Sequence, residues 1–239
     1  MASTVIKNWD NKTWLSSQDY IESFNKFLLK HIKLNSNSKI LDIGCGRGKI
    51  LGNLNSRLHL KTKPIGIDLV NHNDKDKRIM FKKLDALSFF KDYKKKFDLI
   101  LIKQTIHLLS MHNIRKLIDD CKKNLNRDGI ILVFTLDPYN NEIPSFELMK
   151  KVLNKSLQRD KMILKLLLKY SSGKSSKKFI YKVKVTKKKY LKMIKNRFIS
   201  TLLLMTEKEI SKGITEIKSK FNNLLRFNDN LICIVLKNN

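Results

Sequence analysis

One stretch near the start of the chain, from Ile40 to Gly48, most constrains the fold that this sequence can adopt. It reads Ile-Leu-Asp-Ile-Gly-Cys-Gly-Arg-Gly, an apolar run with one acid that leads into three closely spaced glycines. Short continuous apolar runs are typical of buried strands in parallel sheets. Glycine tolerates a positive φ and lets a ligand approach the backbone closely, and a helix that follows offers unpaired N–H groups. The stretch therefore predicts a nucleotide-sized site at the carboxyl end of a strand.

The spacing of the glycines excludes two familiar nucleotide-binding loops. A dinucleotide-binding turn, G-x-G-x-x-G/A, needs a small residue at position 49, where this chain has Lys49. A Walker loop, G-x-x-x-x-G-K-[ST], does not fit because the glycines are too close together and Ile50 follows the lysine. The pattern that remains is D-x-G-x-G-x-G, from Asp42 to Gly48.

This pattern resembles the first motif of class I, Rossmann-like methyltransferases that depend on S-adenosylmethionine (SAM). The resemblance implies SAM as cofactor and S-adenosyl-L-homocysteine (SAH) as product. It also implies that the acid lies near the methionine amino end of SAM, and that the methionine part passes close to the turn. The cofactor contacts expected from this stretch are Asp42, Ile43, Gly44, Cys45, Gly46 and Gly48.

Two further acids follow predicted strands. The stretch 64–68 reads as a second strand that ends in Asp68, 20 residues beyond Gly48. A carboxylate at that place can accept both hydroxyls of a ribose, and we expect Leu69 to contribute to the same site. A third strand over 79–84 is followed by Asp85 and Ala86. The resemblance implies a contact of Asp85 with the adenine amino group. Asp85 can equally cap the next helix, and the two roles are compatible.

The stretch 97–102 is a fourth buried strand, and it resembles the F-D-L-I motif of the same family. Gln104 after it is a candidate contact for the methionine end of SAM. His107 is a candidate general base and substrate contact, because it is the histidine placed to titrate near a substrate. The alternative for His107 is a packed or capping residue beside Leu108. A glycine turn over 126–129 then leads into a fifth strand over 130–134.

The order of these elements predicts an α/β fold. We expect a seven-stranded, mostly parallel, doubly wound sheet with an antiparallel C-terminal strand, helices on both faces and an inserted substrate cap. One methyltransferase domain would span 1–239, with an N-terminal helical segment over 1–34, a SAM-binding core over 35–141, a cap insert over 142–205, and a C-terminal helix and closing strands over 206–239. The last strands are predicted as a hairpin, 224–227 and 231–236, around Asn228-Asp229-Asn230, while 179–185 competes for the sixth position.

A capped acceptor site favours a small-molecule substrate. The residues expected to meet that substrate are Trp14, Tyr20, His107 and Arg197, with Tyr190 as a second candidate catalytic group. Core packing is the alternative for Trp14 and for its neighbour Trp9, and a surface ion pair is the alternative for Arg197. The stretch Asp137-Pro138-Tyr139-Asn140 resembles the D-P-P-Y signature of enzymes that methylate the amino group of adenine in nucleic acid. That signature follows the fourth strand in its family and the fifth strand here, so it gives little support.

The charge leaves alternatives open. The net charge of +29 is consistent with an RNA or tRNA methyltransferase that docks through lysines over 174–189, or with a non-catalytic protein that binds a partner through its basic face. However, 42 of the 50 basic residues are lysine, and arginine is the better residue for bidentate phosphate contacts. Compositional drift toward lysine explains the charge without a nucleic-acid partner.

The remaining composition predicts a reduced, soluble, cytoplasmic protein. The three cysteines are far apart and show no C-x-x-C spacing, so neither a zinc site nor a disulfide framework is expected. The sequence has no apolar run of about 18 residues, and residues 1–10 lack the apolar centre of a signal peptide. We expect no bound metal and no membrane span, and the sequence gives no oligomeric state.

Overall fold

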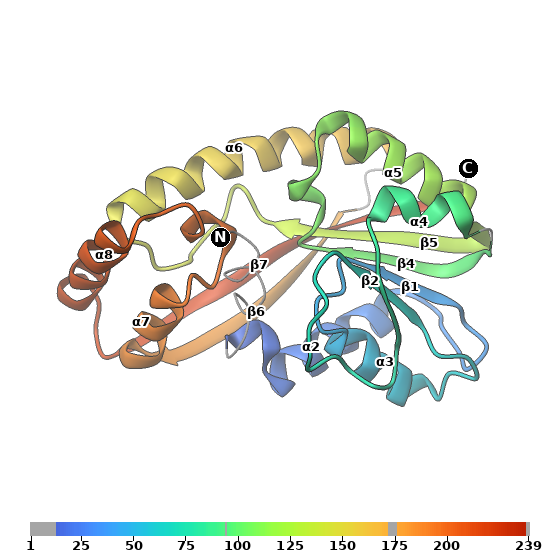
Figure 1. Ribbon diagram of the computed structural model, residues 1–239, viewed down its shortest axis with the longest axis horizontal. Helices are drawn as coiled ribbons and strands as arrows, with labels where there is room; N and C mark the ends of the chain where they lie inside the picture. The colour runs from blue at the N-terminus through green and yellow to red at the C-terminus, as the bar shows by residue number, and fades with distance from the viewer. Residues whose placement is uncertain (1–12, 94, 172–175, 238–239) are drawn as a thin grey trace. The chain divides into compact units, whose positions relative to one another are not determined.

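The computed structural model describes residues 13–93, 95–171 and 176–237 (Figure 1). Trp9 and the start of the basic stretch at 174 lie outside the described residues. Within this part of the chain the strands form one seven-stranded sheet in the order β3-β2-β1-β4-β5-β7-β6. The strands are β1 (Ile40–Ile43), β2 (Ile65–Asp68), β3 (Met80–Lys83), β4 (Phe97–Lys103), β5 (Leu125–Leu136), β6 (Ser176–Thr186) and β7 (Leu224–Lys237).

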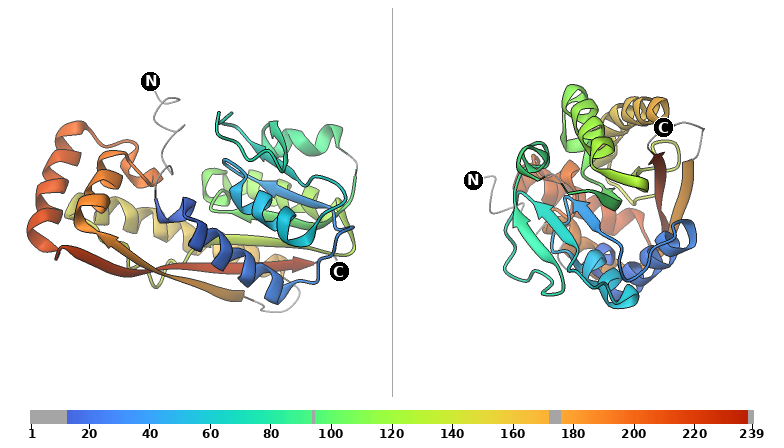
Figure 2. Two further views of the ribbon diagram at one scale, coloured as in Figure 1. Left: turned by 90° about the horizontal axis from the view of Figure 1, so that it is seen from below. Right: turned by 90° about the vertical axis from the view of Figure 1, so that its right-hand side faces the viewer.

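The first five strands are parallel: β1 pairs with β2 and β4, β2 with β3, and β4 with β5. Strand β7 runs antiparallel to β5 and β6, as the arrowheads in Figures 1 and 2 show. The predicted α/β fold, with its mostly parallel sheet and antiparallel C-terminal strand, is confirmed.

The described part of the chain also contains seven α-helices and three 3₁₀ turns. The α-helices are α2 (Gln18–His31), α3 (Lys49–Leu58), α4 (Ala86–Asp92), α5 (Met111–Lys123), α6 (Glu147–Tyr170), α7 (Lys187–Lys195) and α8 (Glu207–Lys220). The 3₁₀ turns are η1 (Trp14–Ser16), η2 (Ile106–Leu108) and η3 (Ser200–Leu202). Among the described helices, none combines the length and the apolar composition that a membrane crossing requires.

The chain groups into two compact units, which we describe separately. The larger unit contains the described residues of 21–135, 162–179 and 231–237, and the smaller unit those of 13–20, 136–161 and 180–230. This grouping does not test the expected cap insert over 142–205, which stays a prediction.

In the larger unit, helices cover both faces of the parallel strands: α4 and α5 lie on one face, α2 and α3 on the other (Figures 1 and 2). Helix α5 is amphipathic because its buried residues recur three or four positions apart: Ile114, Leu117, Ile118 and Cys121. They pack with Ile100 and Ile102 of β4 and with the last turns of α6 in one hydrophobic core. On the opposite face, Phe24 of α2 contacts Phe134 of β5 with ring centroids 4.7 Å apart. Strands β1, β2 and β4 are largely buried, as their apolar sequences predict, whereas the edge strand β3 is partly exposed.

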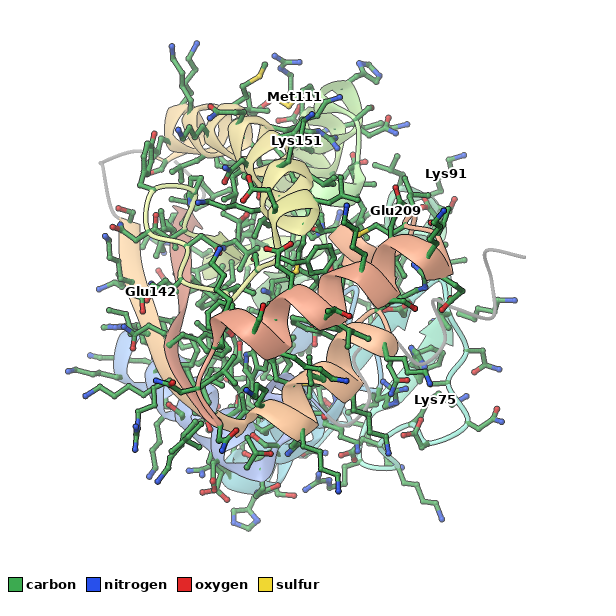
Figure 3. The ribbon with its side chains drawn as sticks, turned by 90° about the vertical axis from the view of Figure 1, so that its left-hand side faces the viewer. Lys75, Lys91, Met111, Glu142, Lys151 and Glu209 are labelled. Atoms are coloured by element: carbon green, nitrogen blue, oxygen red, sulfur yellow. The ribbon has the colours of Figure 1, made fainter. Side chains whose placement is uncertain are left out.

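In the smaller unit, an aromatic cluster and a capped helix hold the chain together. The ring of Trp14 makes edge contacts with Phe198 and Phe227, with centroids 5.3 Å and 5.2 Å away. Helix α8 begins with a capping box: Thr206 Oγ1 accepts a hydrogen bond from Glu209 N, and the Glu209 carboxylate (labelled in Figure 3) accepts one from Thr206 N.

Two local predictions are wrong. The predicted C-terminal hairpin is a single strand, β7, whereas the alternative that 179–185 is the sixth strand is confirmed, because it forms part of β6. Asn228 and Asn230 do not turn the chain: both side chains donate hydrogen bonds to the carboxylate of Glu142. The glycine turn expected over 126–129 is an irregularity inside β5, where the pairing register with β4 shifts.

Candidate functional site

The glycine turn joins β1 to α3 in a conformation that suits glycine. Gly44, Gly46 and Gly48 have φ angles of +75°, +54° and +69°, a region that other residues adopt at a cost. The N–H groups of Gly44 and Cys45 both donate to Ile67 O, at 2.9 and 3.0 Å, and fix the turn to β2.

Close packing, as well as the positive φ angle, requires glycine at position 44, and this packing is not evident from the sequence. A Cβ atom at this position would lie 2.0 Å from Oγ1 of Thr105, which follows β4. The turn therefore packs directly against the segment that carries Gln104 and His107, and this close approach brings two of the predicted site segments together.

Asp42 is a buried acid at the centre of the site. Its side chain lies in β1 with 4% exposure, and its Oδ1 has no hydrogen-bond partner among the described residues. Burial raises the pKa of Asp42 to about 7, the charge of Lys103 lowers it, and that of Asp68 raises it. An unsatisfied buried carboxylate oxygen lowers stability. A ligand with a cationic hydrogen-bond donor would satisfy it, so the site fits the amino group of SAM.

Asp68 ties the end of β2 to the glycine turn. Its Oδ2 accepts a hydrogen bond from Gly46 N at 2.8 Å, and its Oδ1 accepts one from Val70 N at 2.8 Å. The next side chain, Leu69, is 65% exposed, which is unusual for a large apolar residue. The structure thus places Asp68 beside the turn, with an apolar side chain after it.

Asp85 is the N-cap of α4. Its Oδ1 accepts hydrogen bonds from Leu87 N and Ser88 N, at 2.9 and 3.2 Å, and Ala86 is the first residue of the helix. The predicted capping role is confirmed. Both bonds use one oxygen, so a second role for the other oxygen stays a prediction.

The segment after β4 is strained. Gln104 has a φ of +51°, although it is not glycine, and its N–H donates to Phe134 O at 2.8 Å. Such strain persists where the surroundings enforce it, often at functional sites. His107 follows in η2, where it is partly buried.

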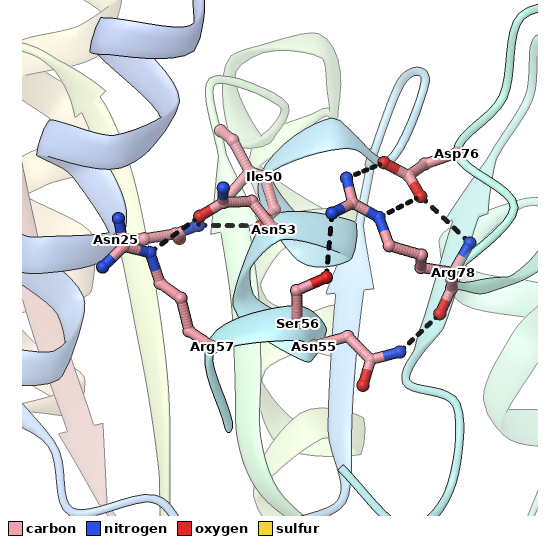
Figure 4. Close-up of polar contacts among 8 residues, drawn as sticks. All are labelled: Asn25, Ile50, Asn53, Asn55, Ser56, Arg57, Asp76 and Arg78. Atoms are coloured by element: carbon pink, nitrogen blue, oxygen red, sulfur yellow. Dashed lines mark hydrogen bonds and ion pairs between the residues drawn. The ribbon is translucent and has the colours of Figure 1, made fainter. Parts of the chain in front are cut away.

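A charged loop over 71–78 is bound to the turn by hydrogen bonds and an ion pair. This attachment was not predicted from the sequence. Nε of Arg47, a side chain with 4% exposure, donates to both Asp74 oxygens at 2.8 and 2.9 Å, and Asp76 N donates to Arg47 O. Arg78 pairs with Asp76 and also donates to Ser56 of α3 (Figure 4). We call the contacts of this loop with Arg47 and α3 the loop clasp. The alternation of acids and bases over 74–78 is the signal that could have predicted it.

The side chains predicted to meet a substrate from the smaller unit have protein contacts. Trp14 Nε1 donates to Asp229 at 3.0 Å, and burial together with the charge of Asp229 holds the pKa of Tyr20 well above its usual value. Tyr190 is fully buried and donates to Pro144 O. Arg197 forms an ion pair with Glu207 at 2.8 Å. Trp14 packs in the core and Arg197 is ion-paired, as in the alternatives considered for them. Their substrate contacts stay predictions.

Comparison with known proteins shows the family to which this fold belongs. A family model described as a methyltransferase domain matches residues 16–165, more than half of the chain. The chain therefore belongs to the methyltransferase domain family, as a class I, SAM-dependent methyltransferase.

Among individual relatives, the chain is 33% identical over 131 residues to a phosphoethanolamine N-methyltransferase of Plasmodium falciparum. That match covers 50% of this chain and 48% of the relative, so it spans about half of the relative's length.

Two solved structures share the fold. A SAM dependent methyltransferase from Archaeoglobus fulgidus has a TM-score of 0.54 and 17% identity, over 98% of both chains. The plantazolicin methyltransferase BpumL, in complex with a pentazolic desmethylPZN analog and SAH, has a TM-score of 0.53 and 18% identity, over 99% of this chain and 90% of that one.

Proposed function

We propose that this chain transfers the methyl group of SAM to a small-molecule acceptor. One observation carries the proposal: the unsatisfied carboxylate oxygen of Asp42 lies beside a glycine turn with three positive φ angles. The strand order reverses between β1 and β4, and ligands of open α/β sheets bind outside the carboxyl ends of the strands at such a point. When bound, SAM supplies a methyl group on a cationic sulfur that a nucleophile displaces in line.

Each predicted contact residue would have its own part in holding SAM. Asp42 would receive the amino group of the methionine part, and Asp68 the ribose hydroxyls. Leu69 and Ala86 would offer apolar contact to the adenine ring, and Asp85 would accept from its amino group. The backbone of the turn would line the methionine part, together with Gln104. The turn residues are Ile43, Gly44, Cys45, Gly46 and Gly48.

The contribution of the chain to the reaction would be positioning and proton removal. Methyl transfer needs the nucleophile held in line with the methyl group and water excluded. A protonated acceptor also needs a base. His107 is the candidate for that base, because the segment that carries it packs on the glycine turn through Thr105.

A small amine is the acceptor class with the most support. The Plasmodium falciparum relative is a phosphoethanolamine N-methyltransferase. The test is a SAH-formation assay with the purified chain and separate acceptors: phosphoethanolamine, other small amines, hydroxylated small molecules and unmodified RNA. Turnover with a small molecule supports the proposal. Turnover with RNA alone, falling steeply as salt rises, overturns it in favour of an RNA methyltransferase.

A further inference from the structure

We propose that Lys103 binds the carboxylate of the methionine part of SAM and SAH, and so completes with Asp42 a dipolar site for an α-amino acid. The inference rests on the proposed function and adds a specificity residue to the cofactor site.

The sheet register puts the two side chains on one face. Asp42 of β1 is paired with Leu101 of β4, and paired residues of neighbouring parallel strands direct their side chains to the same face. Lys103 lies two residues beyond Leu101 and therefore on the same face, one pleat closer to the carboxyl end of the sheet. This is the end where the glycine turn begins.

The Lys103 side chain is held over the protein instead of extending into solvent. Its ammonium lies 5.5 Å from the centroid of the Phe24 ring, a cation–π geometry. It also donates to Gln104 Oε1 at 3.1 Å. Gln104 itself has a left-handed backbone conformation, and Thr105 Oγ1 donates to Lys103 O at 3.1 Å. Several contacts thus fix a positive charge at the end of β4.

The charges match an amino acid. The positive charge of Lys103 is close enough to lower the pKa of Asp42, while an oxygen of Asp42 has no hydrogen-bond partner among the described residues. The methionine part of SAM carries an ammonium and a carboxylate on one carbon atom. A carboxylate and an ammonium from adjacent strands can bind both ends at once, and charge-assisted hydrogen bonds of this kind are among the stronger polar contacts.

The test measures binding by calorimetry, with ligands that differ in the amino acid part. The ligands are SAH, which keeps that part, and 5′-methylthioadenosine, which lacks it. The proteins are the wild type, Lys103→Met, Lys103→Arg and a matched control, Lys122→Met. Lys122 of α5 also lies over an aromatic ring, with its ammonium 5.6 Å from the centroid of Tyr170, so its removal deletes a comparable structural contact.

We expect Lys103→Met to weaken SAH binding on the order of tenfold and to leave 5′-methylthioadenosine binding within about twofold. Lys103→Arg should keep most of the SAH affinity, and Lys122→Met should change neither ligand. Equal losses for both ligands, or no loss of SAH affinity, would overturn the inference. If the wild type binds SAH in neither calorimetry nor thermal shift, the proposed function itself fails.

A second comparison needs no variant. Decarboxylated SAM lacks only the carboxylate, and the wild type should bind it on the order of tenfold more weakly than SAM. Equal affinities for the two compounds would overturn the role of Lys103 even if Lys103→Met did not fold.

Discussion

Asp42, in the strand before the glycine turn, shows how burial and function compete at a single position. Asp42 has a pKa of about 7 in the folded chain, above the value of about 3.9 in an unfolded chain. The folded state therefore keeps a proton that the unfolded state has lost between about pH 4 and 7. Stability falls as pH rises through this window, and the full cost of ionised Asp42 is present above about pH 7.

Asp42→Asn should consequently stabilise the free protein, and more so at pH 8 than at pH 5. We expect a gain of about 2–4 kcal/mol in the free energy of unfolding at pH 8, and a smaller gain at pH 5. Urea unfolding at both pH values measures it. A gain that is equal at both values would show that Asp42 does not carry the pH dependence.

Gly44 gives a prediction of the opposite sign. Gly44→Ala should destabilise the fold by about 2–4 kcal/mol, because the new Cβ meets Thr105 and the φ angle is positive. Thermal unfolding of Gly44→Ala and of the double variant Gly44→Ala/Thr105→Gly separates the two causes. Gly44→Ala should destabilise the Thr105→Gly variant by less than it destabilises the wild type, because the side chain that the new Cβ meets has been removed. No such reduction would mean that the contact with Thr105 is not the cause.

At the scale of elements, hydrogen bonds from neighbouring segments hold the glycine turn and helix α3 in place. The loop clasp binds 71–78 to Arg47 of the turn, and Asn25 of α2 donates to Ile50 O and to Asn53 Oδ1 of α3 (Figure 4). These contacts hold the helix after the glycine turn from two sides. The turn itself is held by hydrogen bonds from two other segments, the loop over 71–78 and the end of β2 at Asp68.

Asp74→Asn should loosen the clasp. It removes the carboxylate from a guanidinium that is almost fully buried, and since Asp74 itself is 54% exposed we expect a modest loss of about 1–2 kcal/mol. Hydrogen exchange should become faster for amides over 71–78. Asp128→Asn, a change at an exposed aspartate of the larger unit, is the control. Unchanged exchange in Asp74→Asn would show that the clasp does not hold the loop.

The capping box of α8 gives a prediction for the smaller unit. Thr206→Ala removes the side chain that accepts from Glu209 N, and we expect a loss of about 1 kcal/mol. Thr215→Ala on the same helix is matched, because its hydroxyl donates to Ser211 O within the helix and does not cap its start. Urea unfolding followed by circular dichroism measures both. Equal effects of the two changes would argue against the capping box as a source of stability.

The sequence predicted β1, β2, β4 and β5 because each contains a short apolar run, and β3 because an acid, Asp85, follows it, as Asp68 ends β2. It did not predict β7 as one strand, because asparagine and aspartate in succession favour a turn. In the smaller unit, Glu142 binds the side chains of Asn228 and Asn230, and Trp14 donates to Asp229. These long-range contacts override the local preference for a turn. The role of Lys103 could not be predicted from the sequence for a similar reason: its position over Phe24 depends on how α2 packs on the sheet.

At the scale of the whole molecule, the charge and the fold give different indications. The net charge of +29 is typical of proteins that bind polyanions, whereas family membership and the cofactor site indicate a methyltransferase. This fold suits a small-molecule methyltransferase whose lysine content rose by compositional drift, and it equally suits an RNA methyltransferase. Both share one requirement, which is that SAM binds at the turn between β1 and α3.

Calorimetric titration of the whole chain with SAH tests that requirement most directly, with Asp68→Ala as the variant. We predict saturable one-to-one binding to the wild type, weakened by at least about tenfold in Asp68→Ala. SAH at 100 times its Kd should also stabilise the wild type by about 2.7 kcal/mol. No binding heat and no thermal stabilisation with folded wild-type protein would contradict the account of the glycine turn as a SAM site.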